Sequence, residues 1–110
     1  MDIIKMEEAE FFFPAGHYGV ADKVIISKKI GAKFDLWYGF FTPGAYAEPH
    51  SHDFEQAFFI LRGEINFIVN GEKKAVGPNT AVYIPPGEVH SLKNERMDMA
   101  ELLVVSMTGK

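Results

Sequence analysis

Cysteine is absent from this 110-residue chain, and its absence excludes two kinds of structure. No disulfide framework can form and no thiolate can bind a metal, so imidazole, carboxylate and amide groups are the good metal ligands that remain. An excess of positive charge is also missing, because 11 basic residues stand against 15 acidic ones and the net charge is −4. Without a basic stripe to hold phosphate groups, we expect no nucleic-acid partner.

Long apolar runs are missing as well. No stretch approaches the roughly 20 residues that cross a bilayer, and residues 1–8 lack the layout of a signal peptide. We therefore expect a cytoplasmic protein without a membrane partner. The length predicts a single domain over residues 1–110, which can bury about two thirds of the surface of the unfolded chain.

Short apolar runs separated by turn residues dominate what is present, and little favours a long helix. Residues 33–42 carry aromatic side chains on both parities, which predicts a strand covered on both faces that Pro43-Gly44 then ends. Asn70-Gly71 predicts a type I′ hairpin between residues 65–69 and 73–76. Further strands are predicted at residues 56–61, 80–84, 89–92 and 100–107. About ten short strands indicate an all-β sandwich or barrel.

Three histidines form the most informative pattern in the chain. His50 and His52 are two residues apart, so on a strand both side chains point to the same face. His90 follows the rigid corner of residues 85–87. Three imidazoles suit Zn, Fe, Ni, Mn or Cu and leave coordination positions open for a substrate.

The spacing around these histidines resembles the two motifs of the cupins. The first cupin motif is Gly, five residues, His-x-His, three or four residues, Glu, six residues, Gly; the second is Gly, five residues, Pro-x-Gly, two residues, His, three residues, Asn. In each motif, four of the five fixed positions agree with this chain. The first motif falls on Gly44, His50, His52, Gln56 and Gly63. The second falls on Asn79, Pro85, Gly87, His90 and Asn94.

This resemblance implies a double-stranded β-helix, the jelly-roll barrel of the cupins, with a core at about residues 33–107 behind an N-terminal arm of residues 1–32. It also implies a site for a divalent transition metal, with Mn, Fe, Ni and Zn not distinguished. The implied ligands are His50, His52, Gln56 and His90.

Two positions depart from the motifs. Asn79 replaces a glycine, and asparagine tolerates the positive φ that such a turn requires. Gln56 replaces the usual glutamate, so an ion held there by neutral ligands keeps its full charge of +2 and favours an anionic ligand such as a carboxylate. Two alternatives remain. Gln56 forms hydrogen bonds without binding the metal in a three-histidine site, or the site no longer holds metal.

Other candidates have less support. His17 lies in a Gly/Pro-rich segment and is interpreted as exposed, with the barrel mouth as the alternative. Glu48 is interpreted as a surface carboxylate rather than a general base, and Glu55 should point away from the histidines because its strand parity is opposite. Three aromatic residues could line a pocket, although a core role is commoner: Tyr38, Phe58 and Tyr83.

Bulky aromatics on successive positions, as at residues 11–13, 40–41 and 58–59, predict that a second face must be covered. The resemblance favours a homodimer that covers it.

Two functions remain open. The favoured one is a metal-dependent enzyme of isomerase, lyase or dioxygenase type acting on a small oxygen-rich or carboxylated molecule, and the alternative is a non-catalytic module that binds or senses a small molecule or metal.

Overall fold

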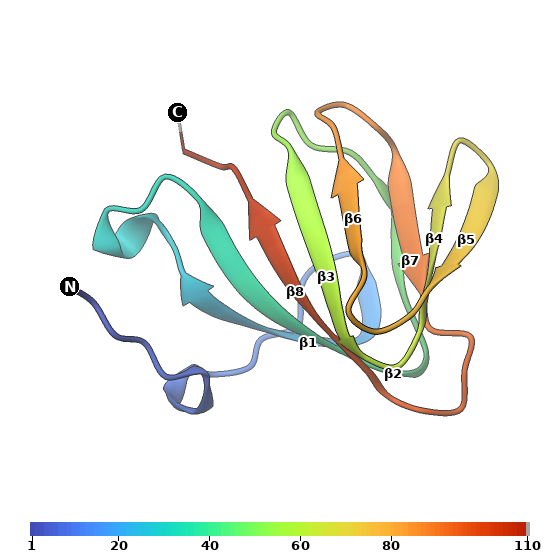
Figure 1. Cartoon of the computed structure of the whole chain (residues 1–110), viewed down its shortest axis with the longest axis horizontal. Coiled ribbons are helices and arrows are strands. Elements are labelled where there is room, and N and C mark those ends of the chain that lie inside the picture. The colour runs from blue at the N-terminus through green and yellow to red at the C-terminus, as the bar shows by residue number, and fades with distance from the viewer. Residues whose placement is uncertain (110) are drawn as a thin grey trace.

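A single antiparallel sheet of eight strands, curled on itself, forms almost all of the regular secondary structure of the described residues (Figure 1). The computed structural model describes residues 1–109. Two short 3-10 helices, Met6–Glu8 and Lys28–Ile30, accompany the sheet, and no helix of the described residues could cross a membrane. The strands are β1 (His17–Ile26), β2 (Asp35–His50), β3 (Gln56–Arg62), β4 (Ile65–Val69), β5 (Glu72–Val76), β6 (Ala81–Ile84), β7 (His90–Lys93) and β8 (Ala100–Ser106).

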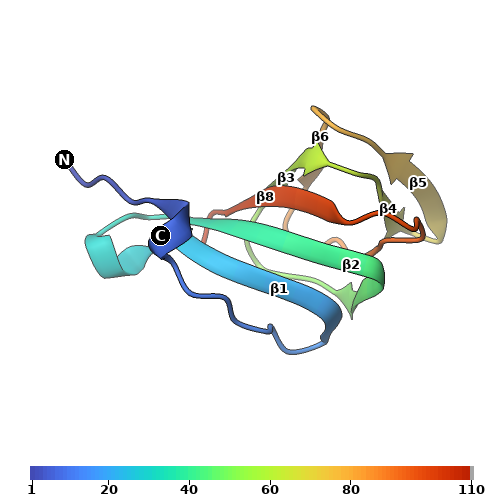
Figure 2. The same cartoon turned by 90° about the horizontal axis from the view of Figure 1, so that it is seen from below.

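The strand order is β5-β4-β7-β2-β8-β3-β6, and β1 pairs with β2 off this path. Apart from the β4–β5 hairpin, neighbours in this order are not consecutive in the sequence, as expected for a jelly roll, and this confirms the predicted fold class. Figure 2 shows β1, β2 and β8 side by side at one side of the molecule while β4, β5 and β6 curve around the other. The curled sheet thus turns the inner faces of its strands toward one another.

The long strand β2 corrects the prediction that Pro43-Gly44 ends a strand. Residues 35–41 pair with β8, residues 46–50 pair with β7, and β1 lies along the other edge. Gly44 has a φ of +81°, so the dipeptide bends the strand and passes it from one neighbour to another. The Pro-Gly pair does interrupt the pairing of β2 with β8, but it marks a corner of the barrel and not the end of the strand.

The turn predictions are confirmed where positive φ is required. Asn70 and Gly71 have φ of 52° and 75°, as a type I′ turn demands, and they join β4 to β5 with Val69 opposite Glu72. Asn79 has a φ of 60°, so it takes the conformation that the family's glycine would take.

Alternation along the strands separates an inner face from an outer face. On β3, Gln56, Phe58 and Ile60 are buried while the residues between them are exposed. The buried core consists of Val20, Phe41, Ala45, Ala47, Phe58, Ile60, Ile65, Phe67, Ile84, Leu92, Ala100 and Leu102.

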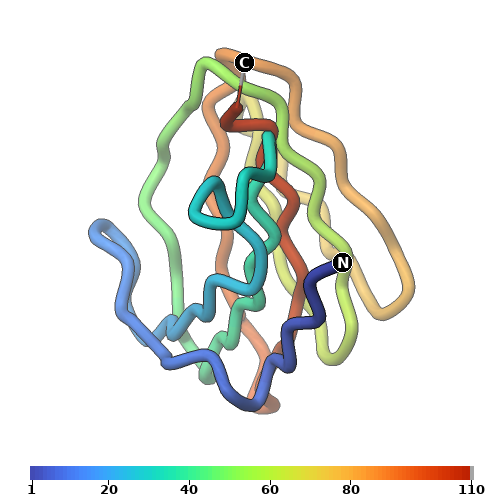
Figure 3. The backbone as a smooth tube through the Cα atoms, turned by 90° about the vertical axis from the view of Figure 1, so that its left-hand side faces the viewer, coloured from blue at the N-terminus to red at the C-terminus, as the bar shows by residue number. Residues whose placement is uncertain are grey.

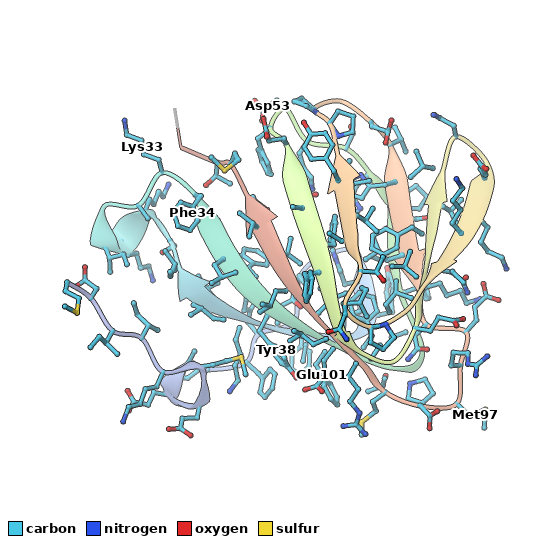
Figure 4. The ribbon with its side chains drawn as sticks, viewed as in Figure 1. Lys33, Phe34, Tyr38, Asp53, Met97 and Glu101 are labelled. Atoms are coloured by element: carbon cyan, nitrogen blue, oxygen red, sulfur yellow. The ribbon has the colours of Figure 1, made fainter. Side chains whose placement is uncertain are left out.

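A side-chain hydrogen bond also links β2 to β8. Figure 4 shows Tyr38 and Glu101 beside each other, and the Tyr38 hydroxyl donates a hydrogen bond to the Glu101 carboxylate.

Candidate metal centre

The three histidines of the two motifs meet at one end of the barrel. His50 ends β2 and lies in register with His90, which begins β7. His52 follows in the β2–β3 loop, and its carbonyl accepts a hydrogen bond of 2.7 Å from the Gly87 N–H in the β6–β7 loop. Figures 1 and 3 show these two loops together at the same end of the molecule. The corner that contains Gly87 therefore fixes the second motif against the first.

The imidazole rings are close enough to share one ion. Their centroids are 4.4 Å apart for His50 and His90, 4.9 Å for His50 and His52, and 5.8 Å for His52 and His90. One ring nitrogen from each histidine lies within 4.8 Å of the other two. Ligands of a transition metal at about 2.0–2.2 Å are separated by less than this, so small side-chain movements complete the set.

Backbone carbonyls orient two of these rings. The Nδ1 of His50 lies 2.6 Å from the carbonyl oxygen of Glu48, and the Nδ1 of His90 lies 2.9 Å from that of Glu88. When Nδ1 carries the proton and donates it to a carbonyl, Nε2 is left with a free lone pair. The Nε2 of His90 is buried and has no hydrogen-bond partner among the described residues. An unsatisfied buried acceptor at this position is what a metal ligand requires.

Gln56 presents a second unsatisfied atom near the same end of the barrel. It begins β3 and is 9 % exposed, with β6 and β8 as its neighbours on the two sides. Its Nε2 donates a hydrogen bond of 2.9 Å to the Ser106 hydroxyl, which leaves the buried Oε1 without a partner in the described chain. The amide is thus oriented with its oxygen free, as a ligand oxygen must be.

Burial favours the neutral form of two of the imidazoles, those of His52 and His90. It lowers the pKa of His52 and His90, and the neighbouring His50 lowers both further. A hydrogen bond from the His90 ring to the Glu88 carbonyl acts in the opposite direction on the His90 pKa, and its effect is smaller than that of burial. Neutral imidazole is the form that binds metal, so the site is prepared for a cation at neutral pH.

A cavity of about 400 Å³ opens beside the histidines, and His50, His52 and Gln56 line it. Its walls are mostly apolar, with contributions from Trp37, Phe58, Leu102 and Val104. A volume of this size is typical of sites for small organic ligands. The donors therefore face a space in which a molecule with an apolar body can lie.

His17 corrects the expectation of an exposed histidine. Its ring centroid lies 5.7 Å from that of His50, its side chain lines the cavity, and its Nδ1 lies 2.8 Å from the carbonyl of Ala15. The reason is β1, a strand that the Gly/Pro-rich sequence around His17 did not indicate, which places His17 opposite Ala47 on β2.

The other candidates are now placed. Glu48 is exposed at the cavity rim, where its carboxylate accepts a 3.0 Å hydrogen bond from the Tyr18 hydroxyl. Glu55 is exposed, as its parity predicted. Phe58 lines the cavity, whereas Tyr38 packs near Phe11 and Tyr83 is 59 % exposed.

The structure also reveals a carboxyl group that the motifs did not indicate. Asp22 on β1 is 7 % exposed and lines the same cavity. Its signal in the sequence is alternation, because it shares strand parity with Val20 and Val24 on an otherwise apolar face. Because Lys23 follows Asp22 directly, the sequence of residues 22–23 also fits a solvent-exposed segment, and Asp22 was therefore not identified.

Comparison with known proteins agrees with the fold and with the motifs. The family model described as "Cupin domain" matches residues 37–106. Auxin-binding protein T85 of Nicotiana tabacum is 28% identical over 102 residues, which are 82% of this chain and 53% of that protein. The chain therefore spans about half the length of this curated relative.

Two solved structures are similar over nearly the whole chain. The polyketide cyclase RemF of Streptomyces resistomycificus has a TM-score of 0.88 at 24% identity, covering 96% of this chain and 78% of its own. A predicted oxalate decarboxylase of Thermotoga maritima has a TM-score of 0.85 at 24% identity, covering 96% of this chain and 97% of its own. At these identities the likeness shows the fold.

Proposed function

The chain belongs to the cupin domain family, and from this premise we propose that it is a metal-dependent enzyme whose ion is held by His50, His52, His90 and Gln56. The observation that carries the proposal is a pair of unsatisfied buried atoms: the Nε2 of His90, within the cluster of three imidazoles, and the Oε1 of Gln56, which lines the same cavity as His50 and His52. A fold that leaves such atoms unpaired without a ligand loses about 1–3 kcal/mol for each of them. A bound cation satisfies both.

The metal would supply Lewis acidity and leave coordination positions open for a ligand oxygen. The protein contributes the rest. The carbonyls of Glu48 and Glu88 hold two rings in the metal-binding tautomer, and Ser106 holds the Gln56 amide. The apolar walls exclude water from the cavity, which strengthens electrostatic interactions inside it.

The charge of the donor set indicates the substrate class. Three neutral imidazoles and a neutral amide leave the full +2 charge of a divalent ion, which favours an anionic oxygen such as a carboxylate. The cavity around it is mostly apolar. We therefore propose a small carboxylated molecule with an apolar body as the substrate, and a divalent transition metal, with Mn, Fe, Ni and Zn not distinguished.

The names of the similar proteins support small-molecule chemistry. One is a polyketide cyclase and another a predicted oxalate decarboxylase, so the fold carries enzymes in these cases. The tobacco relative is named for binding auxin, and this favours the second candidate function, a module that binds a small molecule without transforming it. The cytoplasmic location expected from the sequence stays a prediction.

Gln56→Glu tests the charge argument. The substitution adds one negative charge beside the metal, so the affinity of the metal-loaded protein for phenylacetate should fall at least about tenfold. The measurement is isothermal titration calorimetry on Zn-loaded wild type and variant, with equal zinc content checked by elemental analysis. Glu55→Gln, which changes a charge on the outer face of the same chain segment, should leave the affinity unchanged. Equal or tighter binding by Gln56→Glu would contradict the electrostatic argument.

A further inference from the structure

Asp22 is a buried carboxyl group that the metal centre does not use. It lies in β1 opposite Gly39 of β2, and only 7 % of its surface is exposed. Its backbone N–H and carbonyl both bond to Phe12, with N···O distances of 2.9 and 2.8 Å. The strand position of Asp22 is therefore fixed from both edges.

The missing side chain of Gly39 makes room for this carboxyl group. A Cβ at Gly39 would lie 3.1 Å from the Asp22 Oδ1 and 3.1 Å from the Leu102 Cδ1. Leu102 belongs to the core and lines the cavity, and so does Asp22. The carboxyl group is thus on the inner face of the sheet, in the cavity that His50, His52 and Gln56 also line.

The surroundings of Asp22 make its proton mobile near neutral pH. Burial raises its pKa to about 7, and burial is the one cause of the shift. The two other carboxylates of the cavity accept hydrogen bonds: Asp35 from the Thr108 hydroxyl and Glu48 from the Tyr18 hydroxyl. The remaining titratable groups of the cavity are His17, His50 and His52. The neighbouring Lys23 is directed to the Phe11 ring and the Met6 carbonyl.

We infer that Asp22 is the proton-transfer residue of this cavity and that the substrate is a 2-oxo acid with an apolar body. The inference rests on the proposed function, because the metal centre has to hold the carboxylate and carbonyl oxygens of such an acid. It names a general base that the motif residues lack, since His50, His52 and His90 are committed to the metal.

The step balances without any further reactant. The Asp22 carboxylate takes a proton from the carbon next to the carbonyl, and the C–H electron pair forms the carbon–carbon double bond of an enolate. The carbonyl π pair moves to its oxygen, whose negative charge is stabilised at the cationic end of the cavity. The Asp22 carboxyl group then returns the proton to carbon or to the oxygen. Isomerisation, ring closure and carbon–carbon lyase reactions share this step.

Phenylpyruvate is a suitable probe, because it carries a carboxylate, a carbonyl and an acidic C–H beside an aromatic ring. In D₂O, the Zn-loaded wild type should accelerate exchange of its C3 protons for deuterium, measured by ¹H NMR. Asp22→Asn should reduce this exchange by about 10²-fold or more. Its affinity for phenylpyruvate, measured by calorimetry, should stay within about threefold. Asp98→Asn, at an exposed carboxylate in the β7–β8 loop, should exchange like the wild type.

The outcomes separate this inference from the proposed function. Binding of phenylpyruvate with equal exchange by wild type and Asp22→Asn overturns the role of Asp22, and so does binding without exchange by the wild type. Absence of zinc uptake or of phenylpyruvate binding overturns the proposed function and the inference with it.

A readout independent of activity is the ¹³C NMR titration of carboxyl groups in the metal-free protein. One resonance should titrate near pH 7 and be missing in Asp22→Asn. A titration of the Asp22 resonance near pH 4 would overturn the inference.

Discussion

A single atom of Asp22, Oδ1, shows how strongly one residue can depend on its surroundings in this fold. It lies 3.1 Å from the point where a Cβ of Gly39 would stand, and the core residue Leu102 lies equally close to that point. A carboxylate in such a place loses its hydration, and no neighbouring positive charge compensates for the loss, since burial alone raises the pKa of Asp22. The residue therefore lowers the stability of the protein at neutral pH.

The sign of this effect can be tested with Asp22→Asn. The pKa of Asp22 is about 7 in the folded chain against 3.8 as reference, so the carboxyl group stabilises the fold below pH 4 and loses this contribution as the pH rises through 7. Relative to wild type, Asp22→Asn should gain stability between pH 4 and pH 8, by up to about 4 kcal/mol. Urea denaturation at the two pH values measures the change. A difference between wild type and variant that is independent of pH would contradict the buried position of the carboxyl group.

Site residues could be predicted from the sequence where a short local pattern marks them. His50 and His52 share a strand face because they are two residues apart, and the Pro-Pro-Gly turn of residues 85–87 precedes His90. His17 and Asp22 enter the cavity because β1 pairs with β2, and no local pattern encodes these contacts, which join His17 to Ala47 and Asp22 to Gly39. Their roles became visible only with the sheet in place.

At the scale of elements, the bend of β2 is the feature on which the site depends. Asn94, fully buried, binds across it: its Nδ2 lies 3.2 Å from the carbonyl oxygens of both Phe41 and Thr42. Its backbone also bonds to Gly44 and Ala45, with N···O distances of 2.8 Å for both bonds. The bend turns β2 from β8 toward β7 and so brings His50 opposite His90.

Asn94→Ala should therefore destabilise the protein by about 2–4 kcal/mol, because it leaves buried backbone carbonyls without donors. The neighbouring Lys93→Ala, at an exposed position of β7, should change the free energy of unfolding by less than about 0.5 kcal/mol. Both values come from urea denaturation of the metal-free protein. Equal stabilities of the two variants would show that Asn94 does not hold the bend.

The sequence identified most elements by type but not their connections. The hairpin at Asn70-Gly71 was predictable because the turn is local and requires positive φ at both residues. The prediction that Pro43-Gly44 ends a strand is wrong, because a Pro-Gly pair interrupts pairing in the same way whether a strand ends or changes partner. The described residues form eight strands where about ten were expected, and β2 continues to His50, past the end that the sequence predicted near residue 42.

At the scale of the whole molecule, an apolar outer face remains on the sheet formed by β2, β8, β3 and β6. Among its residues, Phe59 is 39 % exposed, Leu61 42 % and Tyr83 59 %. Phe41 and Phe58, which the sequence pattern placed with them, are core residues instead. The outer face includes Leu36, Phe40, Ala57, Phe59, Leu61, Ala81, Tyr83, Leu103 and Val105.

We propose that residues 1–110 act as one cupin domain and that two copies pair through this outer face. Light scattering of the wild type at micromolar concentration should give the mass of a dimer, and Phe59→Glu should shift it to the mass of a monomer. Lys74→Glu, on the exposed side of the β4–β5 hairpin, should leave the dimer intact. A stable monomer of the wild type at this concentration would contradict the proposal.

The central claim is that His50, His52, His90 and Gln56 hold a transition metal, and elemental analysis tests it most directly. Protein purified without added metal, and again after dialysis with Zn or Ni, should contain close to one equivalent per chain, whereas His52→Ala should lose most of it. Less than about a tenth of an equivalent in the wild type, even after reconstitution, would contradict the account.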